Sequence, residues 1–282
     1  MFVCYNEKRF NLGGHRTMKK FIILLFCSIF VFSGCSTPYK EQKARITEHG
    51  YKQIPPDDFI PKDLRVVSIG DSLTQGVGDV KELGGYIPYL KEKLESQKDI
   101  RTADFINFGI KGNRSDQLLK RLDQPEVQTA IQNADIVMIT IGGNDVMKVF
   151  KQNLTHLKLE TFLQEEKYYR ERLTNIIELV SSYNNQAEII LMGIYNPFMR
   201  WFADIKEMDQ IISTWNDTSS DVVDQFDQAY FVPVADIFYN YEEDLLYTDY
   251  FHPNNKGYEL IAARFYTYFN EHGIVEKAFQ NG

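Results

Sequence analysis

The chain has 282 residues, of which 44% are hydrophobic and 25% are charged. This is the composition of a globular protein, and it excludes a collagen-like rod, a coiled-coil rod and a wholly disordered chain. The formal net charge is −8, although residues 1–34 are basic. The acidic remainder gives no electrostatic support for binding nucleic acid.

Residues 18–34 have the pattern of an export signal. Met18, Lys19 and Lys20 precede an uncharged apolar run over residues 21–32, which is shorter than the roughly 20 residues that a membrane-spanning helix needs. A basic start, a short apolar stretch and small residues before the cleavage point are typical of a signal peptide. Because the signal begins at Met18, we expect translation to start there.

The end of this signal resembles the lipobox of bacterial lipoproteins, since Ser33 and Gly34 stand just before Cys35. The resemblance implies cleavage before Cys35 and a diacylglyceryl group on its sulfur, and two or three acyl chains anchor a protein stably. We therefore expect an exported protein, anchored by lipid to the outer face of the bacterial cytoplasmic membrane. An uncleaved anchor and a plain signal peptide are the alternatives. Processing would remove Cys4 and Cys27, so we expect no disulfide.

A tether and one folded domain are expected after the signal. Residues 35–62 are polar and contain four prolines, as in a linker. In residues 63–282, short apolar runs alternate with helical stripes, which predicts an α/β fold, a three-layer α/β/α sandwich with a mostly parallel, five-stranded sheet. Runs without alternation suit strands buried on both faces. The predicted strands are Arg65–Ile69, Phe105–Phe108, Ile136–Ile141, Ile189–Ile194 and Phe231–Val234. The predicted helical faces are Tyr86, Leu90 and Leu94; Tyr169, Leu173, Ile176 and Val180; Met208, Ile211, Ile212 and Trp215; and Tyr258, Ile261, Ala262, Phe265 and Phe269.

Ligands of open parallel sheets bind at the carboxyl ends of the strands, so the residues that follow each strand are the candidates for chemistry. Gly70-Asp71-Ser72 follows the first strand. Its glycine allows a tight turn, and Ser72 would stand near a helix N-terminus, where backbone N–H groups can stabilise an oxyanion. Ordinary turn chemistry is the alternative, because Gly-Asp-Ser is common in turns.

Two further strand ends carry groups that suit an oxyanion site. The segment after the second strand contains Gly112, and a glycine lets backbone approach a substrate closely. Asn144 follows the third strand and offers a side-chain amide as a donor. The alternatives are an ordinary turn at Gly112 and a helix N-cap at Asp145.

The fifth strand is followed, after a spacer, by a turn that contains both an acid and a base. Asp249 and His252 are three residues apart, so their side chains can meet within one turn. The carboxylate can then bind one ring nitrogen and leave the other facing Ser72. The other four histidines lack this context. A capped helix start is the alternative interpretation.

The four segments together resemble the blocks of the GDSL, or SGNH, hydrolase family: Gly70-Asp71-Ser72-Leu73, Gly112, Gly143-Asn144-Asp145 and Asp249-Tyr250-Phe251-His252. The resemblance runs from about Leu64 to the C-terminus and implies a flavodoxin-like fold. It also implies that Ser72 is a nucleophile, His252 a general base and Asp249 the residue that orients it. The implied oxyanion hole consists of the Ser72 N–H, the Gly112 N–H and the Asn144 amide. No metal or organic cofactor is implied, and no Cys/His cluster suggests one.

The substrate is expected to be a carboxylic ester. An aromatic segment that includes Tyr195, Pro197 and Phe198 follows the fourth strand and is a candidate acyl pocket. An esterase, lipase or lysophospholipase is the leading interpretation. The alternatives are a carbohydrate O-acetylesterase acting on cell-wall glycans and a non-catalytic surface binding protein.

Overall fold

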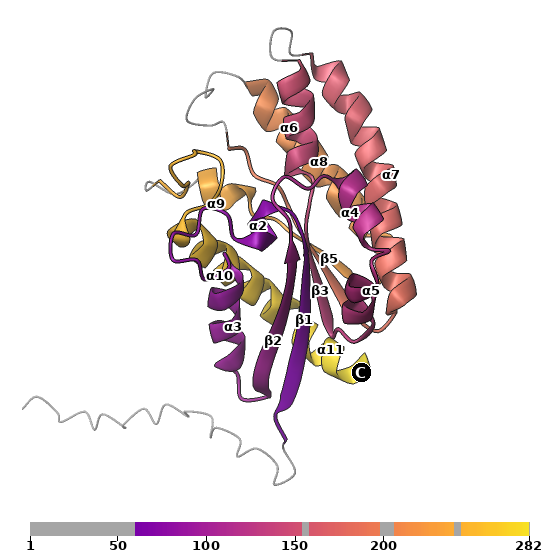
Figure 1. Cartoon of the computed structure of the whole chain (residues 1–282), viewed down its shortest axis with the longest axis vertical. Coiled ribbons are helices and arrows are strands. Elements are labelled where there is room, and N and C mark those ends of the chain that lie inside the picture. The colour runs from indigo at the N-terminus through magenta and orange to yellow at the C-terminus, as the bar shows by residue number, and fades with distance from the viewer. Residues whose placement is uncertain (1–59, 154–157, 198–205, 240–243, 282) are drawn as a thin grey trace, which may run out of the picture. The chain divides into compact units, whose positions relative to one another are not determined.

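The computed structural model of the chain describes residues 60–153, 158–197, 206–239 and 244–281. The signal peptide, Cys35, most of the tether and Phe198 therefore lie outside the described residues. The strands are β1 (Lys62–Gly70), β2 (Ile100–Gly109), β3 (Ile136–Thr140), β4 (Glu188–Met192) and β5 (Ala229–Val232) (Figure 1). The helices are α2 (Ser72–Gln75), α3 (Ile87–Glu95), α4 (Ser115–Arg121), α5 (Pro125–Gln132), α6 (Gly143–Gln152), α7 (Leu159–Tyr183), α8 (Lys206–Val223), α9 (Ala235–Tyr239), α10 (Asn255–His272) and α11 (Ile274–Asn281).

The five strands form one sheet in the order β2-β1-β3-β4-β5, and every pair is parallel. The predicted α/β fold is thus confirmed. At the carboxyl end of β1, Gly70 is in register with Gly109 of β2 and with Thr140 of β3. Because the chain leaves β1 toward β2 and later returns to β3 on its other side, a topological switch point lies between β1 and β3, where doubly wound sheets bind ligands.

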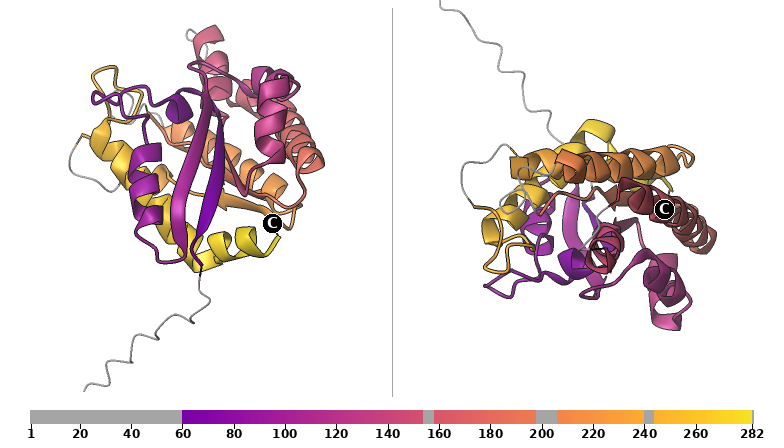
Figure 2. Two further views of the ribbon diagram at one scale, coloured as in Figure 1. Left: turned by 60° about the horizontal axis from the view of Figure 1, so that its bottom comes forward. Right: turned by 90° about the horizontal axis from the view of Figure 1, so that it is seen from above.

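Helices cover both faces of the sheet (Figure 2). Val67 and Ile69 of β1 point into a core cluster built with α4, α5, α6, α7 and α8. Leu64 and Val66 point into the other cluster, which contains α3, α9, α10 and α11. This alternation follows from the two-residue period of a strand. All four predicted helical faces are buried, at positions such as Trp215 and Phe265.

One strand departs from the prediction that every strand is buried on both faces. β2 begins at Ile100, earlier than predicted, and the side chain of Ile106 is 48% exposed. The physical reason is position, because β2 ends the sheet and pairs only with β1. Edge strands have one free side and less helix cover.

None of the helices in the described ranges is long and apolar enough to span a bilayer.

Candidate active site

The turn after β1 presents Ser72 as the first residue of α2. Gly70 has a φ of +142°, and a Cβ there would overlap the carbonyl oxygen of Thr140, so this strand end requires glycine. Asp71 is the N-cap of α2, and its Oδ1 accepts hydrogen bonds from Leu73 N at 3.0 Å and Thr140 Oγ1 at 2.9 Å. The capped turn fixes the direction of the Ser72 side chain.

Asp71 is almost completely buried, and burial raises the pKa of its carboxyl group to about 7 despite the hydrogen bonds from Leu73 and Thr140. The folded protein therefore binds more protons here than the unfolded chain between pH 4 and pH 7. Over this pH range the free energy of unfolding therefore falls as the pH rises, because unfolding releases the proton that the folded state holds. For one group the fall is at most about 1.4 kcal/mol per pH unit.

We expect the Asp71→Asn variant to lose most of this pH dependence. Asparagine keeps the oxygen that caps Leu73 but has no proton to lose. Urea unfolding at pH 4, 5, 6 and 7 should give a flatter decline in the free energy of unfolding than the wild type gives. Identical slopes for the two proteins would show that Asp71 does not titrate in this range.

The turn before α10 brings acid, base and serine together. His252 Nε2 lies 2.9 Å from Ser72 Oγ, and His252 Nδ1 lies 2.6 Å from Asp249 Oδ2. The other carboxylate oxygen of Asp249 accepts the backbone N–H groups of Phe251 and His252, both at 3.0 Å. Burial alone raises the pKa of Asp249, but the hydrogen bonds from His252 and the backbone outweigh it and hold the pKa below its usual value. Asp249 is therefore a carboxylate at neutral pH.

Neighbouring segments hold this turn in place. His252 O accepts a hydrogen bond from Tyr247 N at 2.7 Å, and Leu246 forms a β-bridge with Pro253. The hydroxyl of Tyr195 donates to the carbonyl of Phe251 at 2.7 Å. Because these contacts flank His252 on both sides, they restrict the movement of its ring relative to Ser72.

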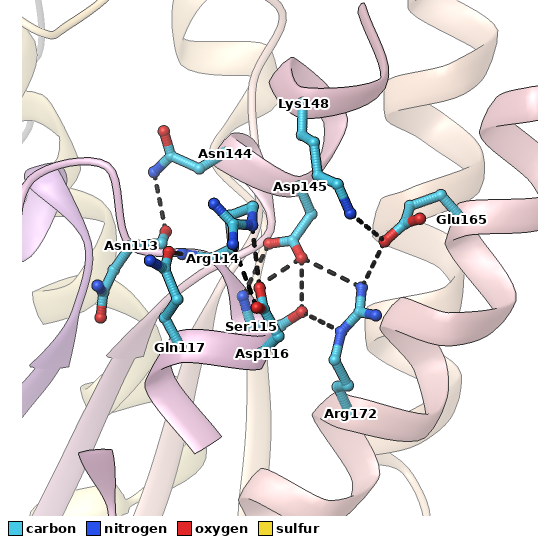
Figure 3. Close-up of polar contacts among 10 residues, drawn as sticks. All are labelled: Asn113, Arg114, Ser115, Asp116, Gln117, Asn144, Asp145, Lys148, Glu165 and Arg172. Carbon is cyan, nitrogen blue, oxygen red and sulfur yellow. Dashed lines mark hydrogen bonds and ion pairs between the residues drawn. The ribbon is translucent and has the colours of Figure 1, made fainter. Parts of the chain in front are cut away.

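The three predicted oxyanion donors have N–H groups available. Asn144 Nδ2 donates to Asn113 O at 3.0 Å (Figure 3), which uses one of its two N–H groups. Within the described part of the chain, the backbone N–H groups of Ser72 and Gly112 donate to no protein acceptor. Gly112 has a φ of +80°, and a Cβ there would meet no atom within 4 Å, so glycine is needed for the backbone conformation alone.

Gly112, Asn144, Asp249 and His252 line a pocket of about 530 Å³, and Ser72 lies behind His252 and is not one of its lining residues. Pro197, one of the predicted pocket residues, lines it. Tyr195 lines only an adjoining cavity of about 30 Å³ and also holds the His252 turn through Phe251. The residues that line the main pocket are Lys111, Gly112, Asn144, Met147, Lys151, Pro197, Asp249, Tyr250, Phe251 and His252.

Sequence analysis assigned no role to five of these pocket residues: Lys111, Met147, Lys151, Tyr250 and Phe251. A signal for two of them was present, because Met147 and Lys151 follow Asn144 at helical spacing and lie on the same side of α6. Lys111 could also have been found, because it directly precedes Gly112, and a residue next to a predicted oxyanion donor must lie near the pocket. Among the described residues, no group of three or more His, Cys, Asp or Glu is placed to hold a metal ion.

Comparison with known proteins places the chain in a family. The profile of the GDSL-like lipase/acylhydrolase family matches residues 68–260, so the chain belongs to this family of hydrolases and is an enzyme of the esterase/lipase type. It is 38% identical over 215 residues to the uncharacterized protein YpmR of Bacillus subtilis, covering 75% of this chain and 84% of YpmR.

Two further similarities are to lipases. The chain is 28% identical over 208 residues to the spore germination lipase LipC of Bacillus licheniformis, covering 71% of this chain and 94% of LipC. The crystal structure of the lipase Lip_vut3 from a goat rumen metagenome shares the fold with a TM-score of 0.65 at 24% identity, covering 72% of this chain and 95% of that one.

Proposed function

We propose that the protein hydrolyses carboxylic esters through a Ser–His–Asp mechanism. The observation that supports this is the chain of contacts from Asp249 through His252 to Ser72, which lies beside the pocket at the carboxyl end of the sheet. Because the Asp249 carboxylate can only accept, it keeps the ring proton on Nδ1 and leaves Nε2 free to accept from Ser72.

In the proposed reaction, Ser72 Oγ attacks the ester carbonyl as His252 Nε2 takes its proton. The negative charge on the tetrahedral oxygen is stabilised by the N–H groups of Ser72 and Gly112 and by the Asn144 amide. His252 then gives the proton to the leaving alcohol, and an acyl-enzyme remains. Water, activated by the same imidazole, releases the acid and restores Ser72.

The Asn144→Ala variant is expected to lower kcat by about 10²–10³-fold with little change in KM, because the lost donor acts on the oxyanion and not on the ground-state ester. Initial rates and thermal unfolding should be measured on the same preparation. A kcat loss below tenfold would mean that the bond from Asn144 to Asn113 O is its main role.

The substrate we propose is an acyl ester of a lipid. Met147, Pro197 and Phe251 give the pocket an apolar wall that suits an acyl chain, and the relative LipC is a lipase. A series of p-nitrophenyl esters from acetate to palmitate, with an O-acetylated glycan beside it, tests this assignment. A preference for medium or long chains is expected. Exclusive activity on acetyl groups would favour a carbohydrate esterase instead, and no hydrolysis of any ester would refute the proposed function.

Two lysines at this pocket favour an ester that carries a negative charge. Lys111 and Lys151 both line it, and within the described residues neither ammonium group has an acidic partner. The acid that lines the pocket, Asp249, is bound to His252. In a chain with a net charge of −8, this local positive charge suits a phosphate in the alcohol part of the ester, as in a lysophospholipid.

We expect kcat/KM to be higher for a monoacylglycerol phosphate than for the monoacylglycerol with the same acyl chain. Lys111→Met and Lys151→Met should each lower the ratio of the two kcat/KM values, phosphate ester over uncharged ester, about two- to fivefold at low salt, since exposed charge pairs are weak. Added NaCl should lower the same ratio in the wild type, because salt screens such pairs. Lys120→Met, on the exposed end of α4, is the matched control. If the wild type and the three variants gave the same ratio of kcat/KM values, Lys111 and Lys151 would have no role in selecting a charged substrate.

We also propose that the enzyme works at the outer surface of the cytoplasmic membrane, anchored through lipid on Cys35. The sequence of residues 18–35 supports this proposal. Expression in a bacterial host with radiolabelled palmitate should label the wild type and leave Cys35→Ser unlabelled. A wild type that carries no label, or equal labelling of the two proteins, would contradict the proposal.

A further inference from the structure

A polar cluster with a buried centre and a partly exposed rim lies beside the proposed oxyanion site and takes no part in the chemistry described above (Figure 3). We call it the Asp145 cluster, and it consists of Ser115, Asp145, Glu165 and Arg172. Asp145 is 1% exposed and Ser115 is fully buried. Ser115 Oγ donates to Asp145 Oδ1 at 2.6 Å, and Ser115 N donates to Asp145 Oδ2 at 3.0 Å.

Arg172 of α7 supplies the positive charge of the cluster. Its Nε donates to Ser115 Oγ at 2.7 Å, and its Nη2 lies 3.3 Å from Asp145 Oδ1 and 2.8 Å from Glu165 Oε1. Burial raises the pKa of Asp145, and the contacts from Ser115 and Arg172 act in the opposite direction. Lys148 reaches Glu165, so within the described residues Arg172 is the cation that compensates Asp145. A buried carboxylate that loses such a partner is strongly destabilised.

The cluster joins the two segments that carry proposed oxyanion donors. Asp145 directly follows Asn144 in the first turn of α6, and Ser115 begins α4 directly after the loop that contains Gly112. The same two segments meet again where Asn144 Nδ2 donates to Asn113 O. Gly112 and Asn144 line the pocket, whereas Ser115 and Arg172 do not. The Ser115–Asp145 contact thus links the two donor-bearing segments behind the pocket, in addition to the bond from Asn144 to Asn113 O.

We propose that Arg172 is a positioning residue of the oxyanion hole: by holding Asp145 on Ser115 it fixes the Asn144 amide relative to the Gly112 N–H. This inference rests on the proposed function of Gly112 and Asn144. Oxyanion donors act only when they are already placed where charge develops, and a displacement of about 1 Å can cost about 10²-fold in rate. Arg172 touches no substrate and acts through Asp145 and Ser115.

The test is the Arg172→Met variant, which removes the charge and keeps much of the apolar side-chain volume. We expect kcat and kcat/KM for a p-nitrophenyl ester to fall together by about 10–100-fold while KM stays within about twofold, because the loss is confined to the transition state. The affinity for an alkyl boronic acid, whose adduct with a serine is tetrahedral and anionic, should weaken by a similar factor. Arg172→Lys, which restores the charge, should recover part of the loss.

Arg170→Met is the matched control, two residues away on the same helix. Arg170 pairs with Glu166 and Asp221, and not with the Asp145 cluster, so its loss should leave kcat within about twofold of the wild type. If Arg172→Met does not fold, Ser115→Ala removes a single hydroxyl of the cluster and should give the same pattern with a smaller loss.

Three results would overturn the proposal. They are a folded Arg172→Met enzyme with kcat like that of Arg170→Met, a rise in KM alone, or a fall in kcat without weaker boronate binding. If Arg172→Met does not fold, an unchanged kcat in Ser115→Ala would overturn it equally. A wild-type enzyme that hydrolyses no ester would instead refute the proposed function on which this inference rests.

Discussion

If Ser72 is the nucleophile as proposed, replacing it with alanine is expected to lower kcat for ester hydrolysis by about 10⁶-fold, the loss that removal of the nucleophilic serine causes in the protease subtilisin. The Ser72 hydroxyl lies 2.9 Å from His252 Nε2. Ser72 itself comes just after the carboxyl end of β1, next to β3, where the topological switch point of the sheet lies. Without Oγ no acyl-enzyme can form, and what remains is water attack assisted by the oxyanion donors.

The variant should remain folded, so loss of activity can be separated from loss of structure. Ser72 is 2% exposed, but alanine fits the space of serine and the first turn of α2 keeps its cap on Asp71. A serine-directed fluorophosphonate should label the wild type on the peptide containing Ser72 and leave Ser72→Ala unlabelled. Residual activity above about one thousandth of wild type would mean that another group attacks the ester.

The contacts among the proposed site residues could be predicted because they depend on local signals at strand ends. Buried β-branched runs located the strands, and parallel strands bring their carboxyl ends to one edge. The contacts of Ser72 and Asp249 with His252 follow from that topology and from a three-residue spacing. For the strand ends and for the Asp249–His252 turn, the residues that form the sequence pattern are the same residues that make the contacts in the structure.

Contacts that depend on the packing of distant helices could not be predicted. Arg172 meets Ser115 across 57 positions of sequence, and no periodicity indicates which residue of α7 faces that point. Asp145 was considered as a helix N-cap, but the cap position is Gly142, and Asp145 is buried against Ser115. The polar contacts of Tyr195 were missed for the same reason, since an aromatic side chain in a loop predicts burial but not its partner.

Substitution of Asp249 by asparagine is expected to lower kcat by about 10⁴-fold, which is a smaller loss than that for Ser72→Ala. Asp249 Oδ1 accepts the backbone N–H groups of Phe251 and His252, whereas Oδ2 faces His252 Nδ1. In the variant the two backbone donors should retain the amide oxygen, which turns the amide NH₂ toward Nδ1. A donor there requires Nδ1 to accept, so the ring proton moves to Nε2 and His252 can no longer take the proton of Ser72.

The same substitution at Asp244, in the segment that borders the His252 turn, is the control. Asp244 caps Leu246 N at 3.0 Å through an oxygen that asparagine also has, so Asp244→Asn should keep kcat within about twofold of the wild type. Measured kcat values for the two variants, with thermal unfolding of each, separate a change of tautomer from a general weakening of the turn. If Asp249→Asn retained more than a tenth of wild-type kcat, the carboxylate would not be setting the proton position on His252, and the base would need another partner.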